Sequence, residues 1–267
     1  MQYDIIIIGG GMVGQAFALS MAKHNLNIAI IEPNNPNPKI QENFHTRVSA
    51  ITPTSEALLK DIGVWDLIQR KQAFSNTHVW DENSHGHLDF SATDDDSTHL
   101  GHIIENDCIQ SAMYGALSDT KVEFIGAKLD SFDKTEQGYR VILDDDKQLE
   151  CSLLIGADGA RSRVRDLAGI AFSENNYQQK AIVCNIRSKQ SFEKTTWQRF
   201  LSNSIIALLP LGEYEASIVW SAENPLADEL LALSPQDFAK RLSAGVELRF
   251  GEFEVLSEIQ AFPLIER

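Results

Sequence analysis

The sequence predicts an α/β protein in which a parallel, Rossmann-like nucleotide-binding domain is joined to an antiparallel sheet with helices. Two observations carry this prediction. A β-branched apolar run at residues 3–8 leads directly into Gly9, Gly11 and Gly14, the strand–turn–helix spacing (GxGxxG) of a dinucleotide-binding βαβ unit. After about residue 175 the pattern changes to short segments typical of an antiparallel sheet. A length of 267 residues suits two such domains.

Each glycine of the turn has its own physical reason. Gly9 permits the tight turn, and Gly11 lets the backbone approach a pyrophosphate because it has no Cβ. Gly14 lets the following helix pack closely on the strand. The start of that helix offers unpaired N–H groups and the positive end of its dipole to phosphates.

The next two elements complete the unit. A broad apolar face predicts a helix over residues 15–24, and a second strand over 27–31 ends at Glu32. A carboxylate about 20 residues past the glycines is placed to accept hydrogen bonds from a ribose, and it disfavours a 2′-phosphate. The alternative is that Glu32 is an ordinary solvated residue after a strand.

The remaining elements of the first half follow in order. Three prolines with asparagines between them predict a loop over residues 34–43, and a short segment follows over 46–51. We expect helices over 53–62, 64–70 and 107–117, a hairpin of 77–81 with 86–90, and strands over 122–125, 128–133, 139–143 and 149–155.

The second half has a different pattern of predicted elements. We expect antiparallel strands over 178–186, 196–201, 205–209 and 215–220, and helices over 226–233 and 235–244. The domain prediction is therefore discontinuous. The nucleotide-binding domain comprises residues 1–75 and 100–175, and the second domain comprises 76–99 and 176–267.

The composition excludes several classes of function. The hydrophobic fraction of 43% and charged fraction of 23% are those of an ordinary globular enzyme. A net charge of −15 argues against nucleic-acid binding and against docking on anionic lipid. Three cysteines without a CxxC pair fit a reducing cytosol. Without a signal peptide or an apolar stretch of roughly 20 residues, we expect a cytoplasmic protein with at most peripheral membrane contact.

A second motif follows the strand at 149–155. The strand ends in a turn that contains Asp158 and Gly159, and a basic helix begins just after it. Taken alone, this motif is compatible with a simple helix cap. Taken with the N-terminal glycines, it resembles the Asp-Gly motif of the class A FAD-dependent aromatic monooxygenases. Arg47, at the start of residues 47–51, resembles the arginine of that family's flavin-contacting segment.

Further segments narrow the resemblance. They are most similar to the ubiquinone-biosynthesis hydroxylases and, among these, to the 2-octaprenylphenol hydroxylases. The segments are Trp80-Asp81, Gly86-His87, residues 99–106 and Phe262-Pro263-Leu264.

The resemblance implies both a fold and an activity. The fold would be like that of p-hydroxybenzoate hydroxylase, with an FAD-binding domain and an inserted substrate domain. The activity would be hydroxylation of the aromatic ring of a polyprenylated phenol in ubiquinone biosynthesis, using FAD, NAD(P)H and O₂ through a C4a-hydroperoxyflavin. The partners would be that phenol, O₂ and other ubiquinone-biosynthesis proteins, at or near the inner membrane. No protein nucleophile is required, so we assign no catalytic side chain.

The resemblance also assigns roles to residues. Gly9, Gly11 and Gly14 would admit the pyrophosphate, and Glu32 would hold the adenosine ribose. Arg47 would lie against the flavin phosphates or ribityl chain, and Glu105 or Asn106 would approach the nucleotide. Asp158 and Gly159 would contact the flavin side of the cofactor or the NAD(P)H entry face. The full set of predicted cofactor-binding residues is Gly9, Gly11, Gly14, Glu32, Arg47, Glu105, Asp158 and Gly159.

One feature departs from the family pattern. The family carries a third flavin motif, a Gly-Asp pair, after the segment that corresponds to Phe262-Pro263-Leu264, and this chain has no Gly-Asp pair. We therefore expect the chain as given to be C-terminally truncated, to bind flavin poorly and to have little activity.

The histidines were considered as metal ligands. His85, His87, His99 and His102 are closely spaced, but the sequence shows no acidic residues in a supporting pattern beside them. The sequence therefore predicts no metal site.

Three alternatives to the hydroxylase stay open. The chain could belong to another flavoprotein oxidase of the same nucleotide fold, to a plain nicotinamide dehydrogenase, or to a non-catalytic scaffold in a ubiquinone-biosynthesis complex.

The aromatic and apolar candidates for substrate contact in the second domain fit core positions better than ligand positions; they are Phe200, Leu208, Pro210 and Trp220.

Overall fold

The computed structural model describes residues 2–34 and 36–267, which divide into two compact units. Asn35, in the predicted proline-rich loop, lies outside the described residues. Unit 1 comprises Met1–Ile40, Ala57–Gln69 and Asn106–Ser173. Unit 2 comprises Gln41–Glu56, Arg70–Glu105 and Glu174–Arg267.

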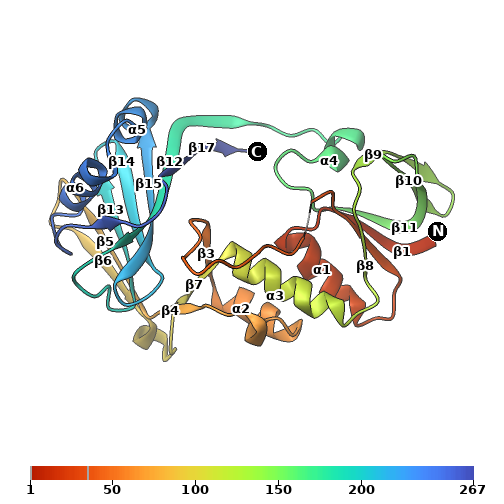
Figure 1. Ribbon diagram of the computed structural model, residues 1–267, viewed down its shortest axis with the longest axis horizontal. Coiled ribbons are helices and arrows are strands. Elements are labelled where there is room, and N and C mark those ends of the chain that lie inside the picture. The colour runs from red at the N-terminus through yellow and green to blue at the C-terminus, as the bar shows by residue number, and fades with distance from the viewer. Residues whose placement is uncertain (1, 35) are drawn as a thin grey trace. The chain divides into compact units, whose positions relative to one another are not determined.

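Unit 1 is built on a six-stranded sheet with the strand order β8-β2-β1-β11-β10-β9 (Figure 1). The first four strands in that order are parallel, and β10 and β9 extend the sheet as antiparallel strands. The strands are β1 (Gln2–Ile8), β2 (Ile28–Ile31), β8 (Glu123–Ile125), β9 (Leu129–Thr135), β10 (Gly138–Leu143) and β11 (Gln148–Gly156).

The β-branched run of β1 forms the centre of unit 1. Ile6 and Ile8 belong to a buried cluster on one face of the sheet, and Ile7, on the other face, faces the start of α1. Helix α1 packs against α3. The helices assigned to this part of the chain are α1 (Met12–Ala22), α2 (Pro53–Asp61), which extends into both units, η1 (Trp65–Leu67), α3 (Asn106–Ser118) and α4 (Arg163–Leu167).

Unit 2 is built on an eight-stranded sheet with the order β16-β12-β15-β14-β13-β5-β6, and β17 also pairs with β12. All pairs are antiparallel except β13 with β5, which are parallel. The strands are β5 (Asn76–Asp81), β6 (His87–Ser91), β12 (Asn175–Arg187), β13 (Thr195–Leu201), β14 (Ser204–Pro210), β15 (Glu215–Glu223), β16 (Glu254–Val255) and β17 (Gln260–Glu266).

One face of this sheet carries the core of unit 2. Trp80, Ile218 and Trp220 belong to a buried cluster that includes side chains of helices α5 (Asn224–Leu231) and α6 (Pro235–Gly245), which lie along that face (Figure 1). The same unit holds a small antiparallel sheet of β3 (Val48–Ile51), β7 (Gly101–Glu105) and β4 (Gln72–Phe74), and a 3-10 turn, η2 (Ala92–Asp95).

The predicted elements can now be compared with the observed ones. The βαβ unit and the 77–90 hairpin are present. The four antiparallel strands predicted between residues 178 and 220 and both C-terminal helices are also present. The predicted helix over 64–70 is only the three-residue turn η1, and α1 begins at Met12, not at residue 15. Segments 41–56, 70–75 and 100–105, which the sequence analysis grouped with the nucleotide domain, lie in unit 2. These segments belong together in unit 2 because they contain β3, β4 and β7, and both β3 and β4 pair with β7.

Within the described residues, the helices are all too short or too polar to cross a lipid bilayer.

Candidate functional site

The glycine turn lies where β1 ends and α1 begins, at the carboxyl edge of the parallel strands. Gly9 has a φ of +109°, and a Cβ there would lie 2.3 Å from the carbonyl oxygen of Ala157. A Cβ on Gly14 would lie 2.0 Å from the carbonyl oxygen of Gly9. At Gly11, in contrast, nothing lies within 4 Å of the position that a Cβ would take. Gly9 and Gly14 therefore serve the turn itself, whereas Gly11 borders open space.

The start of α1 is equipped to receive an anion. Gly11 is the N-cap residue, and no side chain caps the helix. The first intrahelical donor is Gln15, whose N–H lies 3.0 Å from the Gly11 carbonyl oxygen. The preceding N–H groups of the first turn have no helical acceptor, and together with the helix dipole they favour a phosphate.

Glu32 lies directly beside this turn. Its Oε2 accepts a hydrogen bond of 2.8 Å from the Gly10 N–H, and its Oε1 accepts one of 3.0 Å from the Asn34 N–H. A Cβ on Gly10 would lie 2.8 Å from the side chain of Glu32, so the acid and the turn are in close contact. Oε1 also accepts a hydrogen bond of 3.0 Å from the side-chain amide of Asn34, so the lone pair that is available to a ribose hydroxyl is on Oε2.

Gln15 completes the turn and was missed by the sequence analysis. Its side chain is fully buried, and its Nε2 donates to the carbonyl oxygen of Gly10 at 2.7 Å and to that of Pro36 at 3.3 Å. These bonds tie the turn to the following loop. The available signal was a long polar side chain within an otherwise apolar helix.

The Asp-Gly turn lies next to the glycine turn because β11 is the parallel neighbour of β1. The N–H of Ala157 donates to the carbonyl oxygen of Ile8 at 2.7 Å. Gly159 has a φ of +81°, and a Cβ there would meet no atom within 4 Å. The structure therefore brings Gly159 and its neighbours to the same edge of the sheet as Gly9.

The carboxylate of Asp158 is engaged in capping α4. Its Oδ1 accepts from the Ser162 hydroxyl at 2.6 Å, and its Oδ2 accepts from the N–H groups of Arg163 at 2.6 Å and Val164 at 3.2 Å. This is the helix-cap arrangement that the sequence motif left open. A role for Asp158 toward a cofactor stays a prediction.

Arg47 and Glu105 belong to unit 2, where they lie on one continuous network. The Arg47 guanidinium carbon lies 5.7 Å from the ring centre of Phe262, and the Arg47 N–H lies 3.3 Å from Nδ1 of His45. The N–H of His45 in turn donates to Oε1 of Glu105 at 2.7 Å. Arg47 itself is exposed, so its charge can be offered to a ligand.

Glu105 is buried and its carboxylate is used within the chain. Only 2% of the residue is exposed, and its two oxygens lie 2.8 and 2.9 Å from Nε and a terminal nitrogen of Arg70. Arg70 was not among the residues predicted for the site. Because a paired buried carboxylate fixes the backbone of residues 42–47, we interpret Glu105 as a residue that positions the Arg47 segment.

The candidates for substrate contact differ in burial. Leu208, Pro210 and Trp220 are buried, and Leu208 and Trp220 belong to the core of unit 2. Phe200 is 38% exposed.

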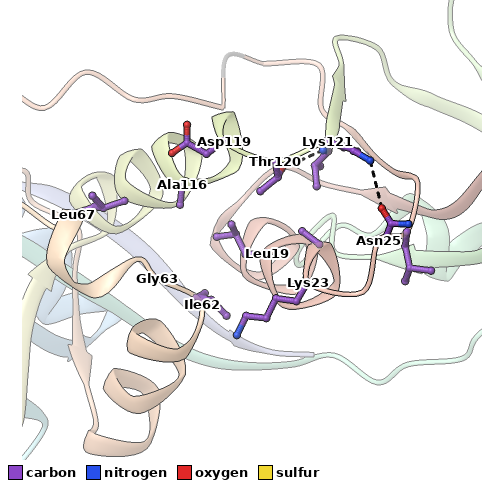
Figure 2. A pocket seen from close by; sticks show the side chains of 13 residues that line it. Leu19, Lys23, Asn25, Ile62, Gly63, Leu67, Ala116, Asp119, Thr120 and Lys121 are labelled. Carbon is purple, nitrogen blue, oxygen red and sulfur yellow. Dashed lines mark hydrogen bonds between the residues drawn. The ribbon is translucent and has the colours of Figure 1, made fainter.

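A separate hollow of about 680 Å³ lies at the other end of α1 from the glycine turn (Figure 2). Its lining includes Leu19, Ile62 and Leu67. The two lysines at its rim are already engaged, Lys23 with Asp61 at 2.7 Å and Lys121 with Asn25 at 3.4 Å. Its lining lacks the phosphate-binding features of the glycine turn.

The residues of the turn fit the ADP part of FAD. The open space at Gly11, the uncapped start of α1 and the adjacent carboxylate of Glu32 are the three features that such a ligand requires. A protein with this turn and with an antiparallel second unit is, by class, a dinucleotide-binding α/β protein.

The family comparison narrows that class. The model of the FAD binding domain family matches residues 2–265. The chain belongs to this family of FAD-dependent monooxygenases, in the group of the ubiquinone-biosynthesis hydroxylases.

Two curated relatives illustrate the group. The chain is 33% identical over 262 residues to the mitochondrial ubiquinone biosynthesis monooxygenase COQ6 of Mus musculus, covering 91% of this chain and 55% of that protein. It is 31% identical over 269 residues to 3-demethoxyubiquinol 3-hydroxylase of Escherichia coli strain K12, covering 99% of this chain and 68% of that protein. The chain thus spans about half the length of its mitochondrial relatives.

Solved structures confirm the predicted fold class. The flavoprotein PqsL of Pseudomonas aeruginosa in complex with 2-aminobenzoylacetate matches with a TM-score of 0.79 at 17% identity, covering 96% of this chain and 74% of that chain. The p-nitrophenol 4-monooxygenase PnpA of Pseudomonas putida DLL-E4 matches with a TM-score of 0.73 at 16% identity, covering 99% and 68%. At this identity the likeness concerns the fold alone.

Proposed function

We propose that the protein hydroxylates the aromatic ring of a polyprenylated phenol in ubiquinone biosynthesis, using FAD, NAD(P)H and O₂. The observation that carries the cofactor is the open space at Gly11, bordered by the uncapped start of α1 and by Glu32. The family supports the reaction class, and the similarity to COQ6 and to 3-demethoxyubiquinol 3-hydroxylase supports a substrate of ubiquinone biosynthesis.

Each cofactor-binding residue has a proposed task. The N–H groups at the start of α1 bind the pyrophosphate, and Glu32 accepts from the adenosine ribose while it repels a 2′-phosphate. Arg47 adds a positive charge that Glu105 holds in place through His45. Asp158 keeps α4 and the Asp-Gly turn rigid. When bound and reduced by NAD(P)H, FAD supplies the activation of O₂ that hydroxylation needs.

An apolar face in unit 2 supports a hydrophobic substrate. Along β5 and β13, side chains that alternate with the core residues point to the sheet face opposite α5 and α6. Leu88 and Phe90 of β6 share this face by register and are 62% and 52% exposed, and Phe200 of β13 also lies there. Exposed apolar surface of this kind marks binding sites for apolar ligands, and a prenyl chain is one.

The proposal is tested on the purified full-length protein with a short-chain prenylated phenol and isotope-labelled O₂. We expect the phenol to accelerate NAD(P)H oxidation and one labelled oxygen atom to enter its ring. The variant G11A is the matched control, because its Cβ would occupy the space that the pyrophosphate needs. H₂O₂ formation without labelled product would instead support an oxidase. NAD binding without FAD would support a dehydrogenase, and retention of ubiquinone-biosynthesis partners without FAD would support a scaffold.

The place of the reaction in the cell is part of the same proposal. We propose a cytoplasmic protein that touches the inner membrane only peripherally, because its substrate is lipid-like and its own net charge of −15 disfavours anionic lipid. Flotation with neutral vesicles that contain the phenol, compared with vesicles that lack it, measures this contact.

A further inference from the structure

Two of the four closely spaced histidines meet a carboxylate that the sequence did not associate with them. Glu56 lies in the first turn of α2, His102 lies in β7, and His99 lies just before that strand. Oε2 of Glu56 is 2.8 Å from Nε2 of His99 and 3.2 Å from Nδ1 of His102. The two imidazole ring centres are 4.5 Å apart. His85, in contrast, is exposed in the β5–β6 hairpin, and His87 lies 3.4 Å from Asp89.

The three ligand atoms already lie at distances close to those of a metal site. All of them are within 4.8 Å of one another. Around a tetrahedral zinc ion with bonds of about 2.0–2.2 Å, ligand atoms are about 3.4 Å apart. The contacts of Glu56 with His99 and His102 therefore have to widen by about 0.6 and 0.2 Å, respectively, to admit an ion.

The burial of the three side chains is also suitable for a metal site. The exposed fractions of the side chains are 8% for Glu56, 13% for His102 and 23% for His99. The low exposure of the carboxylate makes its charge costly unless it is paired, and a divalent cation pairs it more strongly than neutral imidazoles do. The partial exposure of His99 leaves a route for an ion and for a coordinating water.

The hydrogen bond of His99 to Thr98 allows the required tautomer. Nδ1 of His99 lies 2.9 Å from the Thr98 hydroxyl, which can either donate or accept. Without an ion, Nε2–H of His99 can donate to Glu56. With an ion, Nδ1–H donates to Thr98 and the Nε2 lone pair faces the metal, which is the usual outer-shell arrangement for a ligating histidine.

We propose that Glu56, His99 and His102 form a binding site for one divalent transition-metal ion of the zinc type, with water completing the coordination. Two imidazoles and one carboxylate are a donor set that zinc accepts. Such an ion links the start of α2 to β7 and stabilises the folded chain by mass action.

The experiment is a titration of chelator-treated full-length protein with Zn²⁺ by calorimetry, followed by Co²⁺ substitution and visible absorption spectroscopy. We expect one ion per chain, ligand-field bands from bound Co²⁺, and a higher midpoint of thermal unfolding with Zn²⁺. E56Q keeps the side-chain volume and is expected to weaken Zn²⁺ binding by at least about tenfold, because the loss of even a hydrogen-bond partner of a ligand costs about 10–100-fold. H85A is the matched control and should bind as the unaltered protein does.

Two outcomes would overturn the site. One is the absence of stoichiometric binding, and the other is equal Zn²⁺ affinity in E56Q and the unaltered protein, which indicates surface adsorption. If E56Q does not fold, H99A replaces it, because His99 is the most exposed of the three side chains. FAD binding measured on the same variants keeps this test separate from the proposed function, since none of the three residues is assigned to the cofactor.

Discussion

At the scale of the single residue, the glycines of the turn have unequal roles. A side chain at Gly14 would run into the backbone of Gly9, whereas one at Gly11 would enter open space. Sequence spacing alone assigns both positions to the same motif. The structure separates a glycine that the fold requires from one that the ligand requires.

This difference gives a paired prediction. G14A should lower the free energy of unfolding by about 1–3 kcal/mol or more, because a new methyl group has to displace backbone. G11A should change it by less than about 1 kcal/mol, the usual effect at an N-cap, and yet weaken FAD or ADP binding at least about tenfold. Urea unfolding and calorimetric titration measure the two effects. Equal loss of stability in both variants would contradict the assignment.

At the scale of the element, α4 is too short to be stable by itself, and Asp158 holds its first turn. D158N keeps the shape of the side chain but replaces one acceptor oxygen with a donor. We expect a loss of about 0.5–2 kcal/mol and faster amide hydrogen exchange over residues 162–168. D166N, on the exposed side of the same helix, is the control and should leave the exchange unchanged.

If D158N leaves exchange in α4 unaltered while FAD affinity falls, the carboxylate acts on the cofactor and not on the helix. Faster exchange in α4 with unaltered FAD affinity would establish Asp158 as a cap of the helix.

The ion pair of Arg70 with Glu105 ties β7 to the segment that carries Arg47. R70A leaves a carboxylate in a site that is 2% exposed, and we expect a loss of about 3–5 kcal/mol of stability. R187A is the matched control, since the Arg187–Glu215 pair lies at the surface and such pairs contribute at most about 1 kcal/mol. Chemical denaturation of both variants measures the contrast, and equal losses would refute it.

The elements that were predictable are those with local patterns. The β1 run, the glycines and the following helix were read from adjacent residues, and the 77–90 hairpin from its turn. The parallel pairing of β5 with β13 was not predictable, because it joins Thr77 to Thr196 across the chain. For the same reason β17, which completes the sheet beside β12, was missed. Arg70 and Glu56 acquire their roles only through partners distant in sequence.

At the scale of the whole molecule, both units bury groups that resist ionisation. Burial raises the pKa of the Cys184 thiol in unit 2 to about 12 and that of Cys151 in unit 1 to about 11. Burial and the nearby Glu123 raise the pKa of Tyr3 to about 12. The folded state therefore favours the protonated forms over a range in which the unfolded chain ionises.

The sign of the pH dependence follows. The stabilisation from these groups is fully present below the unfolded pKa values, 9.0 for cysteine and 10.0 for tyrosine, and it is lost as the pH rises through the folded values. We expect the free energy of unfolding to fall between about pH 9 and pH 12. C184A should show a shallower decline in urea titrations over this range. An identical slope in C184A would show that the thiol does not contribute.

The interleaved chain path of the two units has a consequence for synthesis. The central strand β1 leaves the ribosome first, yet its parallel neighbour β11 ends only at Gly156. At about 5–20 residues per second, the isoleucine-rich β1 waits roughly 7–30 s for that partner. During this interval its apolar edge is open to pairing with other nascent chains. Yield in cells should therefore depend more on translation rate and on chaperone supply than the stability of the finished protein suggests.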